Sequence, residues 1–302
     1  MTKGTRRYPT LPEEHDLVYL RPLMPSPTWV STDDGCKLAA FDFGGDGEPL
    51  MFVHATGFHA HLWLPVIELL SDCFHCYAFD QRGHGASPTP PDGNFAWGRM
   101  GEDARQVAGE LGLSRPKVVG HSGGGAQLLL AEEDHPGSWE ALWAFEPVVL
   151  DAPLPPTESG DNPMAAGAMK RRDRFDSRDA AYANFVSKDP FAAFTPEALR
   201  LYVEYGFVED PEGGVRLACR REDEAAMYRN APSAGTFERL DLVRIPTHWA
   251  CGATSTHLPA ERLRAAAARL RAGEVEELEG VGHFAPFENP GLVAASIRRT
   301  LA

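Results

Sequence analysis

The segment that most constrains this chain is Gly-His-Ser-Gly-Gly at residues 120–124, preceded by Lys-Val-Val and followed by an Ala/Leu-rich run. The pattern Gly-x-Ser-x-Gly is typical of a nucleophile elbow, in which a strand turns sharply into a helix and strains the serine backbone. The helix that follows directs its N–H groups and its positive dipole end at the reacting centre. This context predicts a strand, an elbow with Ser122 as the nucleophile, and a helix. The alternative is a glycine-rich turn with a structural serine.

The rest of the chain alternates between short apolar runs and segments with helical spacing. Such alternation predicts an α/β fold with a mostly parallel, doubly wound sheet. Strands are expected at 28–32, 37–44, 49–55, 74–80, 117–120, within 140–150, and at 245–252 and 274–280, and helices at 61–70, 95–112, 123–134, 259–273 and 290–302.

Two parts of the chain depart from this alternation. Residues 1–26 are rich in proline and charge and are expected to form an N-terminal arm. Residues 151–240 are also rich in proline and charge and contain short helical pieces, so we expect a helical lid outside the sheet. The predicted core then consists of 27–150 and 241–302.

Charge and composition narrow the class of partner. The 302 residues carry 43 acidic and 29 basic side chains, a net charge of −14, which disfavours nucleic acid as a partner. The sequence has no run of 18 apolar residues and no leader-like N-terminus, so we expect a cytoplasmic protein that does not bind membranes. Cys73 and Cys76 have CxxC spacing without a second pair, so ordinary thiols are expected rather than a metal site.

Four landmarks together resemble the α/β-hydrolase superfamily, over residues 27–302. They are "VHATGF" at 53–58, "DQRGHGAS" at 80–87, the elbow, and "GVGHFAPFENP" at 280–290. The resemblance implies an α/β-hydrolase fold with an eight-stranded sheet, helices on both faces and an inserted helical lid. It also implies that the backbone N–H groups of Thr56 and Gly123 form the oxyanion hole, although Ala55 stands where the family usually has glycine.

The general base is expected to be a histidine, since imidazole exchanges a proton near neutral pH. His283 lies in a Gly-flanked loop after the last predicted strand, at the sheet edge where such folds place their sites. We favour it over His54, expected to brace the oxyanion loop, over His84 in a tight turn, and over His121, expected to point away from the site.

The acid that orients the histidine is not where the family usually places it. The segment "CGATST" at 251–256 has Ser255 at the expected position, and a hydroxyl cannot stabilise an imidazolium as a carboxylate does. Glu146 ends the strand "LWAF" beside the nucleophile strand, and an acid there is costly to bury without a partner. We therefore predict Glu146 as the acid, as in the similar zearalenone-type lactone hydrolases and one type of haloalkane dehalogenase. Weaker rivals are Asp241, expected at the wrong edge of the sheet, and Glu288, expected to cap the last helix.

These residues predict a serine hydrolase with a Ser122–His283–Glu146 triad, acting without a metal or organic cofactor. Phe58 and Trp63, with aromatic residues of the lid, are expected to line an apolar pocket for a small or medium-sized ester or lactone. The expected partner is therefore a small apolar molecule, bound by a monomer or homodimer. Amide or carbon–carbon bond hydrolysis stays open, as does a catalytically silent receptor on the same fold.

Overall fold

The computed structural model describes residues 24–151, 161–231 and 235–302, and the greater part of the predicted N-terminal arm lies outside these ranges. An eight-stranded sheet has the order β1-β2-β4-β3-β5-β6-β10-β11. The first two pairings, β1 with β2 and β2 with β4, are antiparallel, and the other five are parallel. Its strands are β1 (Thr28–Ser31), β2 (Lys37–Gly44), β3 (Glu48–Val53), β4 (Phe74–Phe79), β5 (Lys117–His121), β6 (Leu142–Phe145), β10 (Thr247–Gly252) and β11 (Gly273–Leu278).

Helices cover both faces of the sheet, as the sequence predicts. Alternate residues of β3 face opposite sides, as the period of two in a strand requires. Met51 and Val53 pack in a cluster with α3, α4 and α10, whereas Leu50 and Phe52 pack in a second cluster with α2 and α12. The helices of the core are α2 (Leu64–Ile67), α3 (Trp97–Glu110), α4 (Gly123–Asp134), α9 (Thr236–Arg239), α10 (Ala260–Ala267), α11 (Ala285–Glu288) and α12 (Pro290–Leu301), with 3-10 turns η2 (Ala60–Trp63) and η5 (Leu240–Leu242).

The helix predicted over 61–70 is shorter and divided. A 3-10 turn, η2, precedes α2, which ends at Ile67. Pro65 in the first turn of α2 has no N–H to donate, so a continuous helix through His61 to Leu70 would lack a hydrogen bond there. Apolar spacing alone does not show this division.

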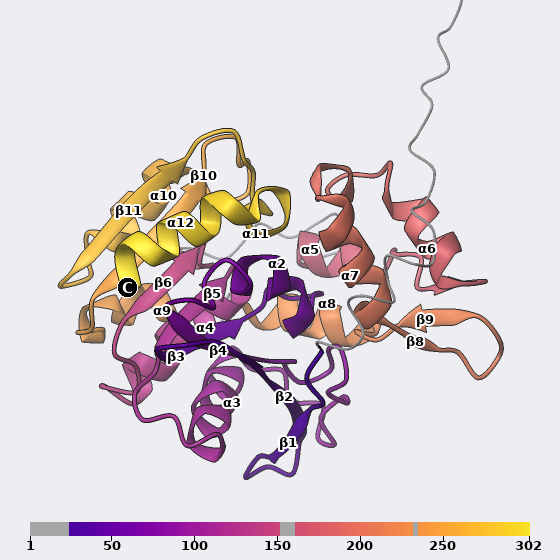
Figure 1. Ribbon diagram of the computed structural model, residues 1–302, viewed down its shortest axis with the longest axis horizontal. Coiled ribbons are helices and arrows are strands. Elements are labelled where there is room, and N and C mark those ends of the chain that lie inside the picture. The colour runs from indigo at the N-terminus through magenta and orange to yellow at the C-terminus, as the bar shows by residue number, and fades with distance from the viewer. Residues whose placement is uncertain (1–23, 152–160, 232–234) are drawn as a thin grey trace, which may run out of the picture.

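Residues 161–230, from α5 to α8, form a separate layer beside the core, to the right in Figure 1. They contain helices and also a small antiparallel sheet of order β7-β9-β8, which the sequence did not predict. Its strands have only two or three residues each, too few to produce a recognisable alternation. The elements are α5 (Pro163–Ala168), β7 (Arg174–Phe175), α6 (Arg178–Phe185), η3 (Phe191–Ala193), α7 (Pro196–Gly206), β8 (Phe207–Glu209), β9 (Val215–Leu217) and α8 (Arg221–Asn230).

None of the helices in the described ranges is long and apolar enough to cross a membrane.

Candidate active site

The predicted elbow lies between β5 and α4, with Ser122 at the turn. Ser122 has φ 54° and ψ −117°, a conformation that non-glycine residues rarely adopt. A Cβ on Gly124 would lie 2.6 Å from the carbonyl oxygen of Val53, and one on Gly120 would lie 2.6 Å from the Cα of Gly125. Glycine is therefore required on both sides of the serine, because the backbones of β3, β5 and α4 meet here.

His283 lies next to the elbow, in the loop between β11 and α11. Its Nε2 is 3.2 Å from Ser122 Oγ, within reach for proton transfer. The imidazole is 8% exposed and Ser122 is half-buried. The structure therefore brings together the two residues predicted as base and nucleophile.

Glu146, directly after β6, is the third residue of this group and lies on the other side of His283 from Ser122. Its Oε2 accepts a hydrogen bond from His283 Nδ1 at 2.6 Å, and the carboxylate is wholly buried. The backbone N–H of Gly252 donates to Oε1 at 3.0 Å. A buried carboxylate with these donors and an imidazole at hydrogen-bond distance has the geometry of the acid in a triad.

Ser255, at the position where the resemblance implies an acid, bonds to Glu146 instead. Its Oγ donates to Glu146 Oε2 at 2.8 Å. The rival acids are not part of this group among the described residues. Asp241 is exposed on η5 before β10, and Glu288 accepts hydrogen bonds from Gly282 N at 2.7 Å and Phe284 N at 3.2 Å.

The expected helix-capping role of Glu288 is therefore wrong. Asn289 caps α12, because its side chain accepts a hydrogen bond from the N–H of Leu292 at 3.1 Å. Glu288 instead holds the backbone on both sides of His283.

The predicted oxyanion residues lie side by side. A Cβ on Gly123 would be 3.0 Å from Thr56 Oγ1. Gly123 is the first residue of α4, where an N–H has no acceptor within the helix. Thr56 is 6% exposed and follows β3. Its neighbour Gly57, at φ 85°, donates its N–H to His84 Nε2 at 2.9 Å, which fixes the loop.

The other three candidate histidines support the backbone around the site. His54 Nδ1 donates to Ala55 O at 2.8 Å, and its Nε2 accepts from Gln81 N at 3.0 Å. His121 Nε2 donates to His283 O at 2.9 Å. Burial lowers the pKa of His54 and His121 well below the usual value and that of His84 to about 4, so all three are neutral near pH 7.

One contact that the sequence did not point to is a second imidazole on His283. The ring of His257 stacks on it, with centroids 4.6 Å apart and planes at 21°. His257 is exposed and follows β10 in the same loop as Ser255. A histidine two residues beyond the usual acid position was the available signal, but spacing alone does not show which way its ring turns.

The two aromatic residues predicted to line a pocket have different surroundings. Phe58 is 8% exposed and contacts Phe284, next to His283, with ring centroids 5.7 Å apart. Trp63 is fully buried in the core, where its ring lies 5.2 Å from that of Phe52. Phe58 therefore lies against the ring that contacts the candidate base, and Trp63 lies beneath the surface.

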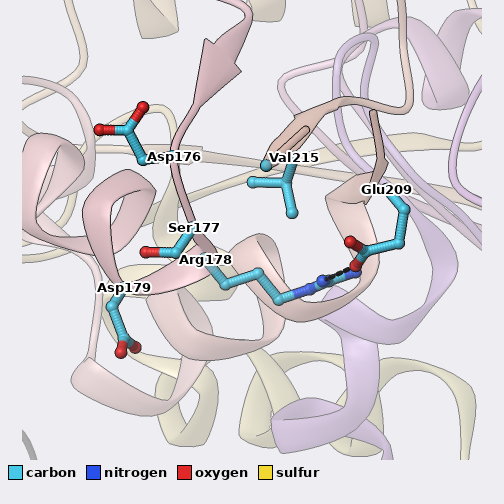
Figure 2. Close-up of a pocket in the computed structure, with 7 residues that line it drawn as sticks. Asp176, Ser177, Arg178, Asp179, Glu209 and Val215 are labelled. Carbon is cyan, nitrogen blue, oxygen red and sulfur yellow. Dashed lines mark hydrogen bonds and ion pairs between the residues drawn. The ribbon is translucent and has the colours of Figure 1, made fainter. Parts of the chain in front are cut away.

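A surface groove of about 410 Å³ lies on the inserted segment and is lined by none of the predicted site residues. Figure 2 shows Arg178 reaching across it to Glu209, with which it forms an ion pair at 2.5 Å. Asp176 and Asp179 make the rest of the groove acidic. This lining differs in character from the aromatic surroundings of His283. In the described part of the chain, no cluster of side chains is suited to hold a metal ion.

Comparison with known proteins identifies the family. The sequence pattern described as "Alpha/beta hydrolase family" matches residues 50–296, most of the chain. This chain belongs to the alpha/beta hydrolase family. Among solved structures, 2-(acetamidomethylene)succinate hydrolase superimposes with a TM-score of 0.79 at 20% identity, covering 91% of this chain and 98% of that one. That likeness shows the shared fold.

Two curated relatives match smaller parts of the sequence. A fluoroacetate dehalogenase from Burkholderia sp. is 34% identical over 99 residues, 32% of this chain and 33% of the relative. A 2-(acetamidomethylene)succinate hydrolase from Mesorhizobium japonicum is 28% identical over 201 residues, 66% of each chain. The first match thus spans about a third of the relative's length and the second just under two thirds.

Proposed function

We propose that this protein is a serine hydrolase that cleaves a small or medium-sized apolar carboxylic ester or lactone. The observation that carries the proposal is the continuous row of hydrogen-bond distances from Ser122 Oγ through His283 to Glu146. Three residues distant in sequence meet in the order nucleophile, base and acid. A purely structural serine would not require that arrangement.

In the proposed mechanism His283 Nε2 takes the proton of Ser122 as its oxygen attacks the substrate carbonyl. The N–H groups of Thr56 and Gly123 donate to the oxyanion that forms. His283 then gives the proton to the leaving alcohol, and an acyl group stays on Ser122. Water, deprotonated by the same imidazole, attacks the acyl-enzyme, and His283 returns the proton to Ser122 Oγ as the acyl–oxygen bond breaks and the acid leaves. Glu146 stabilises the positive imidazole in both halves of the reaction.

The preference for an apolar substrate rests on the side chains near the base. Phe284 lies edge-on to His283, with centroids 5.0 Å apart, and Phe58 lies against both Phe284 and Phe287. Phe194 of the inserted segment packs on the same group, 5.7 Å from Phe284. Aromatic walls of this kind bind apolar groups by removing them from water.

Labelling with a fluorophosphonate probe tests the serine chemistry. The wild-type protein should be labelled covalently, and Ser122→Ala should not. A protein that stays folded but takes no label at Ser122 would instead be the silent receptor, and would contradict the proposal. For the bond type, turnover should be compared on p-nitrophenyl acetate, butyrate and octanoate, on a γ- and a δ-lactone, and on matched anilides. We expect turnover of the esters or lactones to exceed that of the anilides by at least tenfold.

A second candidate is hydrolysis of an amide-type bond. It is favoured by the match to a relative whose name gives 2-(acetamidomethylene)succinate as its substrate. The same nucleophile, base and oxyanion donors serve both reactions, so the site alone does not choose between them. Faster turnover of the anilides than of the esters would support this candidate and refute the ester or lactone proposal.

A further inference from the structure

The loop after β10 contacts both members of the candidate acid–base pair. Ser255 Oγ donates to Glu146 Oε2, the oxygen that also accepts from His283 Nδ1. Two residues later, the ring of His257 covers a face of His283. We call Ser255 and His257 the 255/257 clamp.

Backbone hydrogen bonds hold the clamp to the ends of two strands. The N–H of Ala253 donates to Leu278 O at 2.9 Å, and that of Thr254 donates to Val281 O at 3.1 Å. Within the loop, Ser255 N donates to Gly252 O at 3.0 Å. The loop is thus tied to β11 and to the segment that carries His283. The positions of Ser255 and His257 are therefore set by the same backbone that positions the base.

Ser255 meets a need that burial creates. Glu146 is wholly buried, and a buried carboxylate is stable only when donors surround it. Gly252 N–H binds one oxygen, and Ser255 and His283 bind the other. Donors on both oxygens fix the rotation of the carboxylate, so Oε2 stays directed at the imidazole.

His257 acts on the other member of the pair. The backbone N–H of His257 donates to Ser255 Oγ at 3.3 Å, so a hydrogen bond also joins the two clamp residues to each other. Partial burial and repulsion from His283 lower the pKa of His257, whereas the charge of Glu146 opposes this effect. Near pH 7 the ring is therefore a neutral aromatic surface, which attracts the positive imidazole that forms during the reaction.

His283 is enclosed by a small set of polar and titratable groups. Its ring contacts Ser122 at the elbow and Glu146 just after β6. It also contacts the rings of His121 in β5 and His257 in the clamp loop. Glu288 accepts from the backbone N–H of Phe284, the next residue. The centroid of His121 lies 5.0 Å from that of His283, with the rings tilted by 48°. His257 is the one exposed ring among these contacts, and its stacked geometry restricts rotation of the base.

We propose that Ser255 and His257 are positioning residues that hold Glu146 and His283 in the arrangement that proton transfer from Ser122 requires. The inference rests on the proposed serine-hydrolase function. It assigns to the loop that usually supplies the acid a different task, which is to hold an acid supplied by the neighbouring strand.

The test compares a removing and a conservative variant at each clamp position, with turnover of p-nitrophenyl butyrate as the assay. Ser255→Ala removes one hydrogen bond to a charged group, and we expect kcat to fall about tenfold with KM changed less than twofold. Ser255→Thr keeps the hydroxyl and should recover most of kcat. His257→Ala should lower kcat about threefold, and His257→Phe, which keeps an aromatic surface, should recover it. Thr256→Ala, at the exposed residue between them, is the control and should leave kcat unchanged.

A second measurement reports on position without turnover. The Nδ1 proton of His283, in a 2.6 Å hydrogen bond to Glu146, should give a far-downfield proton NMR signal. Ser255→Ala should shift or broaden that signal, and Thr256→Ala should not. An unchanged signal with unchanged kcat in Ser255→Ala would overturn the clamp. A wild-type protein that takes no fluorophosphonate label would refute the proposed function. The NMR signal does not depend on turnover, so it would still test whether Ser255 positions Glu146 and His283.

Discussion

Replacing Glu146 by glutamine tests the central feature of the site, a carboxylate supplied from β6. Glutamine has nearly the same shape and keeps a carbonyl that can accept from His283, but its NH2 group then faces the N–H of Gly252, so the variant loses the charge and one backbone hydrogen bond. At the observed distance of 2.6 Å, the attraction between a carboxylate and a protonated imidazole is about 6 kcal/mol for an effective dielectric constant of about 20. Part of this is retained, because the glutamine carbonyl is itself a dipole that accepts the same hydrogen bond.

We therefore expect Glu146→Gln to lower kcat about 10³- to 10⁴-fold, equivalent to about 4–5 kcal/mol of activation free energy. KM should change little, because Glu146 is wholly buried behind His283. The assay is steady-state turnover of p-nitrophenyl butyrate, with circular dichroism and a thermal melt to verify folding. Asp241→Asn, which removes an exposed carboxylate before β10, is the matched control and should retain full kcat.

Two results would refute the reasoning. A folded Glu146→Gln protein with kcat within tenfold of the wild type would show that the carboxylate does not support His283. A larger loss in Ser255→Ala than in Glu146→Gln would place the decisive interaction at the loop after β10 instead.

Three further predictions concern stability. Gly124→Ala should prevent stable folding, because its Cβ would lie 2.5 Å from the backbone oxygen of His54. Gly109→Ala is the matched control: a Cβ there meets open space on α3, so thermal melts should show a slightly higher melting temperature. Burial raises the pKa of Glu133 to about 8, so the folded state binds the proton more tightly than the unfolded state and stability should fall as pH rises from about 4.5 to 8. Glu133→Gln should remove that slope in melts at pH 5 and pH 9, and an unaltered slope would contradict the assignment. Burial lowers the pKa of His61 to about 4, so stability should fall as pH drops below about 6.5, and His61→Phe should reduce that fall in urea titrations at pH 7 and pH 4.5.

The sequence predicts the main sheet well because its strands and helices have strong and distinct periodicities. The elbow also follows from sequence, since glycines at 120 and 124 are a steric requirement of the turn. Short elements are less predictable. The two-residue strand β7 and the 3-10 turn η2 have too few residues for a periodic pattern, and their structure depends on tertiary contacts.

Side-chain direction marks the limit of prediction at the site. Sequence position places Ser255 and Glu288 near the candidate base but does not show which atoms they contact, and it did not point to His257. Glu288 accepts from the N–H groups of Gly282 and Phe284, on either side of His283, rather than from the helix that follows. Trp63 was expected at a pocket wall, yet its large ring packs in the core against Phe52. The direction of each of these side chains depends on its tertiary contacts, which cannot be derived from a single sequence.

The position of Glu146 follows from the register of the sheet. Val118 pairs with Leu142 and His121 with Phe145, so residues 118–121 of β5 each lie beside the residue 24 positions later in β6. The residues just after the two strand ends, Ser122 and Glu146, are also 24 positions apart and therefore leave the sheet side by side.

Ser122 and Glu146 both have positive φ, 54° and 42°. The backbone therefore turns away from the sheet directly after β5 and directly after β6. Glu146 also donates its N–H to Ala250 O of β10 at 2.8 Å, which fixes it between β5 and the strand that usually supplies the acid. The ends of β6 and β10 are therefore neighbouring positions from which a carboxylate reaches one imidazole. This geometry explains why a serine at 255 does not leave the base without an acid.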